Sequence, residues 1–161
     1  MGYREATIEA LYRVEGKAEI VGGEIVLMPA AGGFHGYVVG EILASLREHA
    51  RRTKQGIAFG DGVGFVVNLP NRWSFSPDAA FWVGRLTARF PDGALVFAAE
   101  VRSPEDFGPA AERQKADKRA DYFAAGTLVV WDVDMLRDHV VRVYPCERSN
   151  FSNDLCGSGV R

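Results

Sequence analysis

The sequence has few of the residues that build disulfide scaffolds or zinc sites. It contains two cysteines, Cys146 and Cys156, both near the C-terminus, and three histidines. No histidine pair has the short spacing that is typical of metal ligands, and the cysteines lie in a segment rich in Ser, Asn and Gly. We therefore expect two free thiols and neither a zinc framework nor a structural disulfide.

The sequence also lacks long apolar runs and any strong charge bias. No stretch approaches the roughly 18 apolar residues that cross a bilayer, and residues 1–5 carry charges of both signs without a signal-peptide core. The net charge of -2 argues against a strongly basic, non-specific nucleic-acid binder, although a local basic patch would not show in the total. These absences predict a cytoplasmic protein that is not associated with a membrane.

At 161 residues the chain fits one domain. We predict a domain over residues 1–145 and a polar tail over residues 146–161. Hydrophobic periodicity and turn residues predict a helix at 7–14, a hairpin with strands 18–21 and 24–28, a helix at 34–52, strands at 56–59, 63–67, 75–83 and 94–102, a helix at 110–125, and strands at 127–133 and 140–144. This order indicates an α/β (α+β) fold with a mixed central β-sheet flanked by helices and an N-terminal β-hairpin.

Two acidic residues adjoin apolar strands. Glu100 ends the run 94–99, which is typical of a strand buried on both faces. A buried carboxylate costs several kcal/mol unless a cation compensates it, so we predict a functional role for Glu100. Asp78 follows Pro77 and opens the apolar run 79–83. If the two strands are antiparallel neighbours, both carboxylates lie at one edge of the sheet.

A pair of strand-borne carboxylates predicts a site for a hard cation. Asp78 and Glu100, together with the main-chain carbonyl of Val101, would offer only oxygen ligands, which suit Mg²⁺ or Mn²⁺ better than zinc. On the helix that follows, Lys115 and Lys118 share a face with each other. A lysine beside a water activated by a metal can stabilise charge on a phosphoryl oxygen. The combination predicts hydrolysis of a phosphodiester.

These motifs have the order seen in a known group of nucleases. Pro77-Asp78 followed by Glu100-Val101-Arg102 resembles the PD-(D/E)XK signature of restriction-endonuclease-like nucleases, with Arg102 at the usual lysine position. A wider set of motifs resembles the Uma-two family of restriction endonucleases: Gly23-Glu24, Met28-Pro29, His35, Ser103-Pro104, Lys118 four residues before Tyr122, Ala125-Gly126 and Val130-Trp131-Asp132-Val133-Asp134.

The resemblance implies a restriction-endonuclease-like fold, Mg²⁺ with Mn²⁺ as a substitute, and DNA as the substrate. It implies that Lys118 is the displaced lysine, with Lys115 as the fallback. Glu24 would be the acidic residue that an N-terminal element contributes, and His35 an accessory site residue. It also implies a homodimer, because duplex DNA has two-fold symmetry. The contacts with DNA are expected from five basic residues, and they predict a steep salt dependence: Arg72, Arg85, Arg89, Arg102 and Lys115.

Each residue also has a simpler structural interpretation. Glu100 could be an edge-strand carboxylate that faces water, Asp78 a turn residue, and Lys118 a solvated charge paired with nearby acids. Glu24 could be a polar strand residue, and His35 could cap or pack at a helix start.

Two other functions stay open. One is a module with the same fold that does not cut and binds nucleic acid or protein. The polar ending of the sequence would favour this function, because the family usually continues there with further strand and helical structure. The other is a metal-dependent phosphatase for small substrates.

Overall fold

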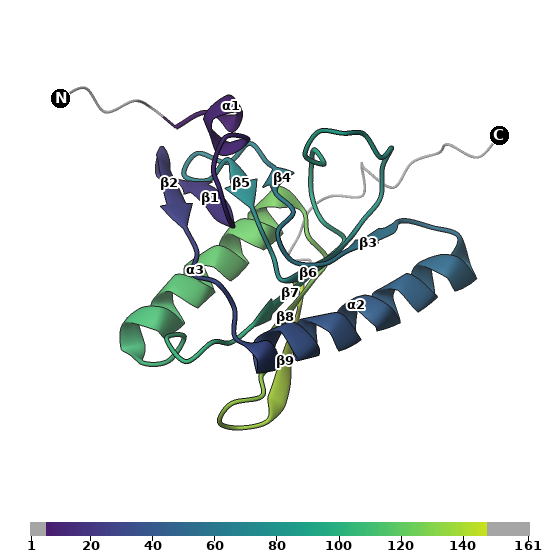
Figure 1. Ribbon diagram of the computed structural model, residues 1–161, viewed down its shortest axis with the longest axis vertical. Helices are drawn as coiled ribbons and strands as arrows, with labels where there is room; N and C mark the ends of the chain where they lie inside the picture. The colour runs from purple at the N-terminus through teal and green to yellow at the C-terminus, as the bar shows by residue number, and fades with distance from the viewer. Residues whose placement is uncertain (1–5, 148–161) are drawn as a thin grey trace.

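The computed structural model describes residues 6–147 of the chain (Figure 1). Only residues 146 and 147 of the predicted tail, 146–161, lie within this range. Cys156 lies outside it. The elements, in chain order, are α1 Ile8–Leu11, β1 Ala18–Val21, β2 Glu24–Leu27, α2 Gly33–Thr53, β3 Ile57–Phe59, β4 Phe65–Val66, β5 Ser74–Phe75, β6 Ala79–Trp82, β7 Phe97–Val101, α3 Pro109–Ala125, β8 Val129–Asp134 and β9 Val140–Pro145. No helix among the described residues is long and apolar enough to cross a membrane.

A five-stranded mixed sheet forms the centre of the fold, with the strand order β3-β6-β7-β8-β9. Only β7 and β8 are parallel, because α3 links them and carries the chain back to the same end of the sheet. Helices α2 and α3 cover opposite faces of this sheet (Figure 1). The predicted α/β architecture with a mixed sheet and flanking helices is therefore confirmed.

The N-terminal hairpin forms where two glycines predict it. Gly22 and Gly23 have φ angles of 59° and 79°, which are readily adopted only by residues without a Cβ, and β1 pairs with β2 directly across them. The hairpin then docks on the strand region around β5. The Ser74 hydroxyl accepts a hydrogen bond of 2.8 Å from the Ile20 N–H, and the Trp73 N–H donates to the Ile20 carbonyl at 3.0 Å.

Apolar side chains fill both spaces between the helices and the sheet. On one face, Tyr122 of α3 is fully buried and its ring stacks on Phe75 with ring centroids 4.0 Å apart. On the other face, Val39 of α2 packs with Val101 and Val133. Residues 98 and 130 of neighbouring strands face α3, whereas residues 101 and 133 face α2, as the alternation of side chains in a strand requires.

One predicted strand differs from the structure. The segment 75–83 was expected to be continuous, but Ser76-Pro77-Asp78 separates β5 from β6. Pro77 has no N–H to offer a neighbouring strand, and the N–H of Ser76 donates instead to the carboxylate of Glu19 at 2.7 Å. The interruption places Asp78 directly before β6, where its side chain faces a cleft.

Candidate active site

Asp78 and Glu100 lie opposite each other in the central sheet. Strands β6 and β7 are antiparallel with Ala79 paired to Ala99, and the Asp78 N–H donates to the Ala99 carbonyl at 3.1 Å. Directly opposite residues of an antiparallel pair point to the same face, so both carboxylates line one cleft, of about 570 Å³. The predicted pairing of the two strands is confirmed. Because β7 is the middle strand, the interpretation of Glu100 as an edge-strand residue is wrong.

The carboxylate of Asp78 is 5% exposed and has three donors. Its Oδ2 accepts from the Val101 N–H at 2.7 Å and lies 3.3 Å from Nε2 of His35. Its Oδ1 lies 2.5 Å from Nζ of Lys17. Burial alone would raise the pKa of Asp78, but the donors from His35, Lys17 and Val101 outweigh it and hold the pKa well below its usual range. Asp78 is therefore an anion at neutral pH.

The pKa of Glu100 is shifted in the opposite direction to that of Asp78. Glu100 Oε1 accepts from the Tyr122 hydroxyl at 2.5 Å and lies 2.8 Å from Nζ of Lys118. Burial raises the pKa of Glu100; Lys118 opposes this shift, while the negative charges of Asp78 and Glu19 add to it. Two neighbouring carboxyl groups whose pKa values move in opposite directions are typical of sites that handle protons or cations.

Helix α3 brings Lys118 to the carboxylates from the far side of the cleft. Its Nζ is 2.8 Å from Glu100 Oε1 and 2.8 Å from Glu19 Oε1. Burial lowers the pKa of Lys118, but the attraction of Glu100 and Glu19 is stronger and raises it above its usual value, so the ammonium stays charged. The interpretation of Lys118 as a solvated charge paired with nearby acids of its own helix is wrong.

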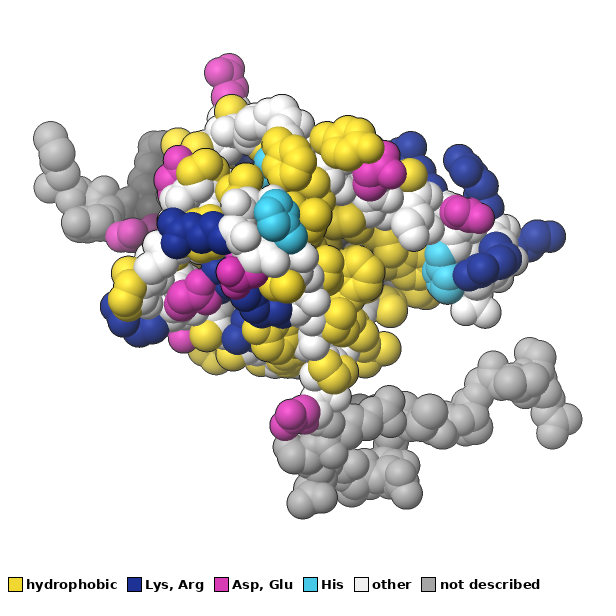
Figure 2. Space-filling model, turned by 90° about the horizontal axis from the view of Figure 1, so that it is seen from below, with side chains coloured by type: hydrophobic (Ala, Val, Ile, Leu, Met, Phe, Trp, Pro, Cys, Tyr) yellow, Lys and Arg dark blue, Asp and Glu magenta, His cyan; other side chains and the backbone are white. Residues whose placement is uncertain are grey.

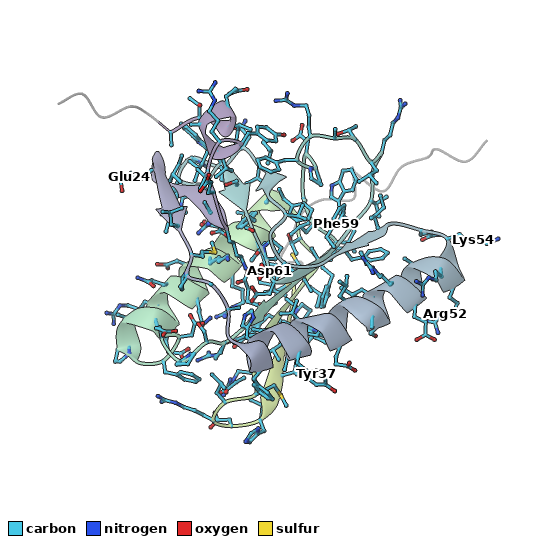
Figure 3. All side chains as sticks on the ribbon, viewed as in Figure 1. Glu24, Tyr37, Arg52, Lys54, Phe59 and Asp61 are labelled. Atoms are coloured by element: carbon cyan, nitrogen blue, oxygen red, sulfur yellow. The ribbon has the colours of Figure 1, made fainter. Side chains whose placement is uncertain are left out.

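The N-terminal hairpin contributes Glu19 to the cleft. Glu19, on β1, is 3% exposed and binds the Ser76 N–H, Lys118, and Nη1 of Arg72 at 2.6 Å. Glu24, the residue expected from the sequence, is exposed beside the turn and lies at the outer margin of the molecule (Figure 3). Sequence analysis missed Glu19, although the signal was the one that identified Glu100: a carboxylate inside an apolar strand.

Lys17, directly before β1, is the other residue that sequence analysis missed. Its Nζ touches Asp78 and lies 2.8 Å from Oδ1 of Asp61, in the turn after β3. Burial lowers the pKa of Lys17, but the negative charges of Asp78 and Glu100 and the hydrogen bond to Asp61 outweigh burial. The pKa of Lys17 is therefore above its usual value. No sequence pattern joins Lys17 to acids so far along the chain. We call the following set the cleft cluster: Lys17, Glu19, His35, Asp78, Glu100, Lys118 and Tyr122.

The other predicted residues have mixed outcomes. His35, in the first turn of α2, does lie beside Asp78, and this carboxylate raises the pKa of the imidazole. Lys115 lines the cleft with its Nζ 3.2 Å from Asp106 Oδ1. Arg72 and Arg102, however, are only 6% and 4% exposed, and this burial argues against the expected contacts with DNA. Both arginines are held by carboxylates inside the protein.

Arg102 is the centre of a second charged group. Its guanidinium forms a two-bond fork on Asp132, with Nε 2.7 Å from Oδ1 and Nη2 2.6 Å from Oδ2, and also binds Glu112. The side chains of Arg102, Glu112 and Asp132 are the Arg102 cluster. Asp132 pairs in register with Glu100, so the two clusters lie side by side on β7 and β8. Figure 2 shows side chains of both charge signs gathered at the end of the molecule where α3 begins.

The donor groups fit one kind of metal ion. Among residues 6–147, no three His, Cys, Asp or Glu side chains are close enough to hold a metal by themselves. Asp78 and Glu100 could bind an ion that keeps most of its waters, with the main chain of Val101 beside them. This is how Mg²⁺ usually binds, through one or two carboxylates and phosphate oxygens, whereas structural zinc requires a complete protein ligand set.

The fold and the cleft define a restriction-endonuclease-like α/β protein. The structure is similar to the crystal structure titled a "putative nuclease belonging to DUF820" from Anabaena variabilis ATCC 29413, with a TM-score of 0.69, 17% sequence identity, and coverage of 89% of this chain and 82% of that chain. At this identity the similarity establishes the fold. Residues 6–150 match the Uma2 family, described as "Putative restriction endonuclease", and the chain belongs to that family. No curated protein matches it.

Proposed function

We propose that this protein is a metal-dependent endonuclease that hydrolyses DNA phosphodiester bonds at the cleft cluster. The observation that carries the proposal is the position of Asp78 opposite Glu100, with Lys118 Nζ 2.8 Å from Glu100. An open cleft lined by two carboxylates and a charged lysine suits phosphoryl chemistry. The family description, a restriction endonuclease, agrees with this chemistry.

Asp78 and Glu100 are the proposed ligands for Mg²⁺, which Mn²⁺ could replace, with the Val101 carbonyl as a third oxygen. When bound, such an ion supplies positive charge to the phosphodiester and activates the attacking water. The low pKa of Asp78 keeps this ligand ionised across the neutral range. Val101 is positioned by its own N–H, which donates to Asp78.

Lys118 is the proposed stabiliser of charge in the transition state. Its ammonium faces the cleft between Glu100 and Glu19, so it can shift toward a phosphoryl oxygen as negative charge develops there. Glu19 acts as a positioning residue that Arg72 and the Ser76 N–H hold in place. Tyr122, buried and hydrogen-bonded to Glu100, fixes the orientation of that carboxylate.

DNA is the proposed substrate because the cleft is open and is bordered by a further cation, Lys115. Since Arg72 and Arg102 are buried, the phosphate contact at the cleft falls to Lys115. Arg85 and Arg89 are exposed, but they lie on the loop between β6 and β7, at the end of these strands opposite Asp78 and Glu100. Each phosphate neutralised contributes about one unit to the slope of log K against log[salt]. A single contact from this set at the cleft predicts a shallower slope than five would.

Nicking of supercoiled plasmid with Mg²⁺ or Mn²⁺ tests the proposal. We expect the wild type to nick and the double variant Asp78→Asn/Glu100→Gln to lose both nicking and Mn²⁺ binding by calorimetry. Asp117→Asn/Glu41→Gln makes the same chemical changes at two exposed positions and serves as the matched control. Equal nicking by the site variant and the wild type would contradict the proposal. DNA binding without metal-dependent turnover would support the non-cutting module instead.

A further inference from the structure

Lys17 contacts Oδ1 of Asp78, the carboxylate oxygen that a metal ion would need to bind. One oxygen of this carboxylate, Oδ2, already faces the Val101 N–H at 2.7 Å and His35 at 3.3 Å. The other oxygen, Oδ1, faces Lys17 Nζ at 2.5 Å. Since Asp78 is buried except toward the cleft, a cation that approaches it has Oδ1 available and meets the ammonium there.

An ammonium and a divalent cation cannot share one carboxylate oxygen without strong repulsion. The repulsion grows in a partly buried site, where water screens charges poorly. Lys17 is only 15% exposed and Asp78 7% exposed in their side chains, so screening at this contact is weak. Lys17 must therefore move before a divalent ion binds Asp78.

The structure contains a second partner for the same ammonium. Lys17 Nζ lies 2.8 Å from Asp61 Oδ1 while it still contacts Asp78. Asp61 is 37% exposed in its side chain, and its Oδ1 is fixed by the N–H of Gly62 at 2.8 Å. A small rotation of the lysine side chain can transfer it from both carboxylates to Asp61 alone, a more exposed residue on the wall of the same cleft. Figure 3 shows Asp61 near the middle of the molecule.

The geometry points to Lys17 as an internal counter-ion that competes with the divalent cation for Asp78, and to Asp61 as the residue that receives it. This inference rests on the proposed metal site. Lys17 neutralises Asp78 in the metal-free protein and so stabilises a buried carboxylate. The Lys17–Asp61 pair then sets the affinity for the metal without being a ligand, which makes both of them positioning residues.

Calorimetric titration with Mn²⁺ alone tests the inference in four proteins: wild type, Lys17→Met, Asp61→Asn and the double variant. We expect Lys17→Met to raise the Mn²⁺ affinity at least about tenfold, because a competing charge is gone. Asp61→Asn should lower the affinity about tenfold, since Lys17 then has only Asp78 as a partner. In the double variant the effect of Asp61→Asn should vanish, because it acts through Lys17.

Other results would overturn the inference. Unchanged affinity in both single variants would do so, and so would an equal effect of Asp61→Asn with and without Lys17, which would mean that Asp61 attracts the metal by its own charge. Lys17→Arg keeps the positive charge and should bind Mn²⁺ like the wild type. If Lys17→Met fails to fold, Asp61→Asn at its exposed turn still gives a result. Lack of Mn²⁺ binding by every variant, wild type included, would instead mark the failure of the proposed metal site.

Discussion

Two clusters of charged residues meet on β7 and use their charges differently. In the cleft cluster, lysines make single contacts with more carboxylates than they can neutralise, and the cluster borders a cleft. In the Arg102 cluster, two residues along the strand, a guanidinium forms a fork on Asp132 and also binds Glu112. The first arrangement leaves carboxylates available to a cation, whereas in the second the guanidinium occupies both oxygens of the buried Asp132.

The pKa shifts follow the same division. In the cleft cluster the pKa of Asp78 is lowered, because its donors His35, Lys17 and Val101 outweigh its burial. The pKa of Glu100 is raised, because its burial and the negative charges of Asp78 and Glu19 outweigh the attraction of Lys118. In the Arg102 cluster the hydrogen bond to Arg102 lowers the pKa of Glu112. Buried charge thus has two uses here: carboxylates held by single contacts beside a cleft favour binding and chemistry, and a carboxylate held at both oxygens by a guanidinium favours a rigid sheet.

Arg102→Met should give the largest effect, and it should be on stability. The substitution leaves Asp132 buried without its cation, which costs about 3–5 kcal/mol of unfolding free energy, measured by urea denaturation. Arg102→Lys keeps the charge but loses the fork, so its loss should be smaller. Mn²⁺ affinity of the folded variant should equal that of the wild type. A variant of normal stability that no longer binds Mn²⁺ would place Arg102 with the site and erase the distinction between the clusters.

Lys118→Met should act on the reaction. Without its ammonium the charge of the transition state is less stabilised, and we expect the nicking rate to fall about 100-fold while Mn²⁺ still binds. The rate is measured as conversion of supercoiled to open-circular plasmid at saturating Mn²⁺. Lys115→Met, one turn earlier, is the matched control and should reduce DNA affinity more than the rate. A full rate in Lys118→Met would remove this residue from the mechanism.

Glu19→Gln compared with Glu24→Gln separates the two acids of the hairpin. Glu19 orients Lys118, so we expect its substitution to reduce nicking about tenfold, as is usual for residues that support a site indirectly. Glu24 faces water, and Glu24→Gln should nick like the wild type. A larger loss of nicking in Glu24→Gln than in Glu19→Gln, measured in the same plasmid assay, would support Glu24, the residue that the family resemblance implied.

The smallest expected effect is the pH dependence of stability, measured by urea denaturation with a chelator present. Because the folded pKa of Glu100 is raised, its protonation stabilises the fold: this contribution is complete below about pH 4.3 and is lost as pH rises through the raised pKa. Asp134, beside the Arg102 cluster, has a lowered pKa because the N–H groups of Arg137 and Leu136 outweigh its burial. Its contribution is present above about pH 3.9 and is lost as pH falls through the lowered pKa.

The contribution of each residue to the pH dependence of the unfolding free energy is isolated by the matching variant, Glu100→Gln or Asp134→Asn. The difference between wild type and variant should change by about 1.4 kcal/mol for each unit by which the folded and unfolded pKa values differ. Slopes of the same sign for Glu100 and Asp134 would contradict the opposite pKa shifts of these two carboxyl groups.

The sequence by itself determined the elements and the two central carboxylates. Local signals suffice for these features: apolar periodicity for α2 and α3, Gly22-Gly23 for the hairpin, and acids at the ends of apolar runs for Asp78 and Glu100. Family motifs added Lys118 and His35, which the structure brings to the same cleft.

Only the tertiary structure decided how the remaining charges pair. The docking of β1 beside β5 turned Glu19 inward and left Glu24 in water, and it buried Arg72 between carboxylates far apart in sequence. The contacts of Lys17 with Asp61 and Asp78 join three separate segments. Ion pairs form wherever packing brings opposite charges together, and no local pattern records that distance. The sequence therefore predicts which residues could act, and the fold determines which of them meet.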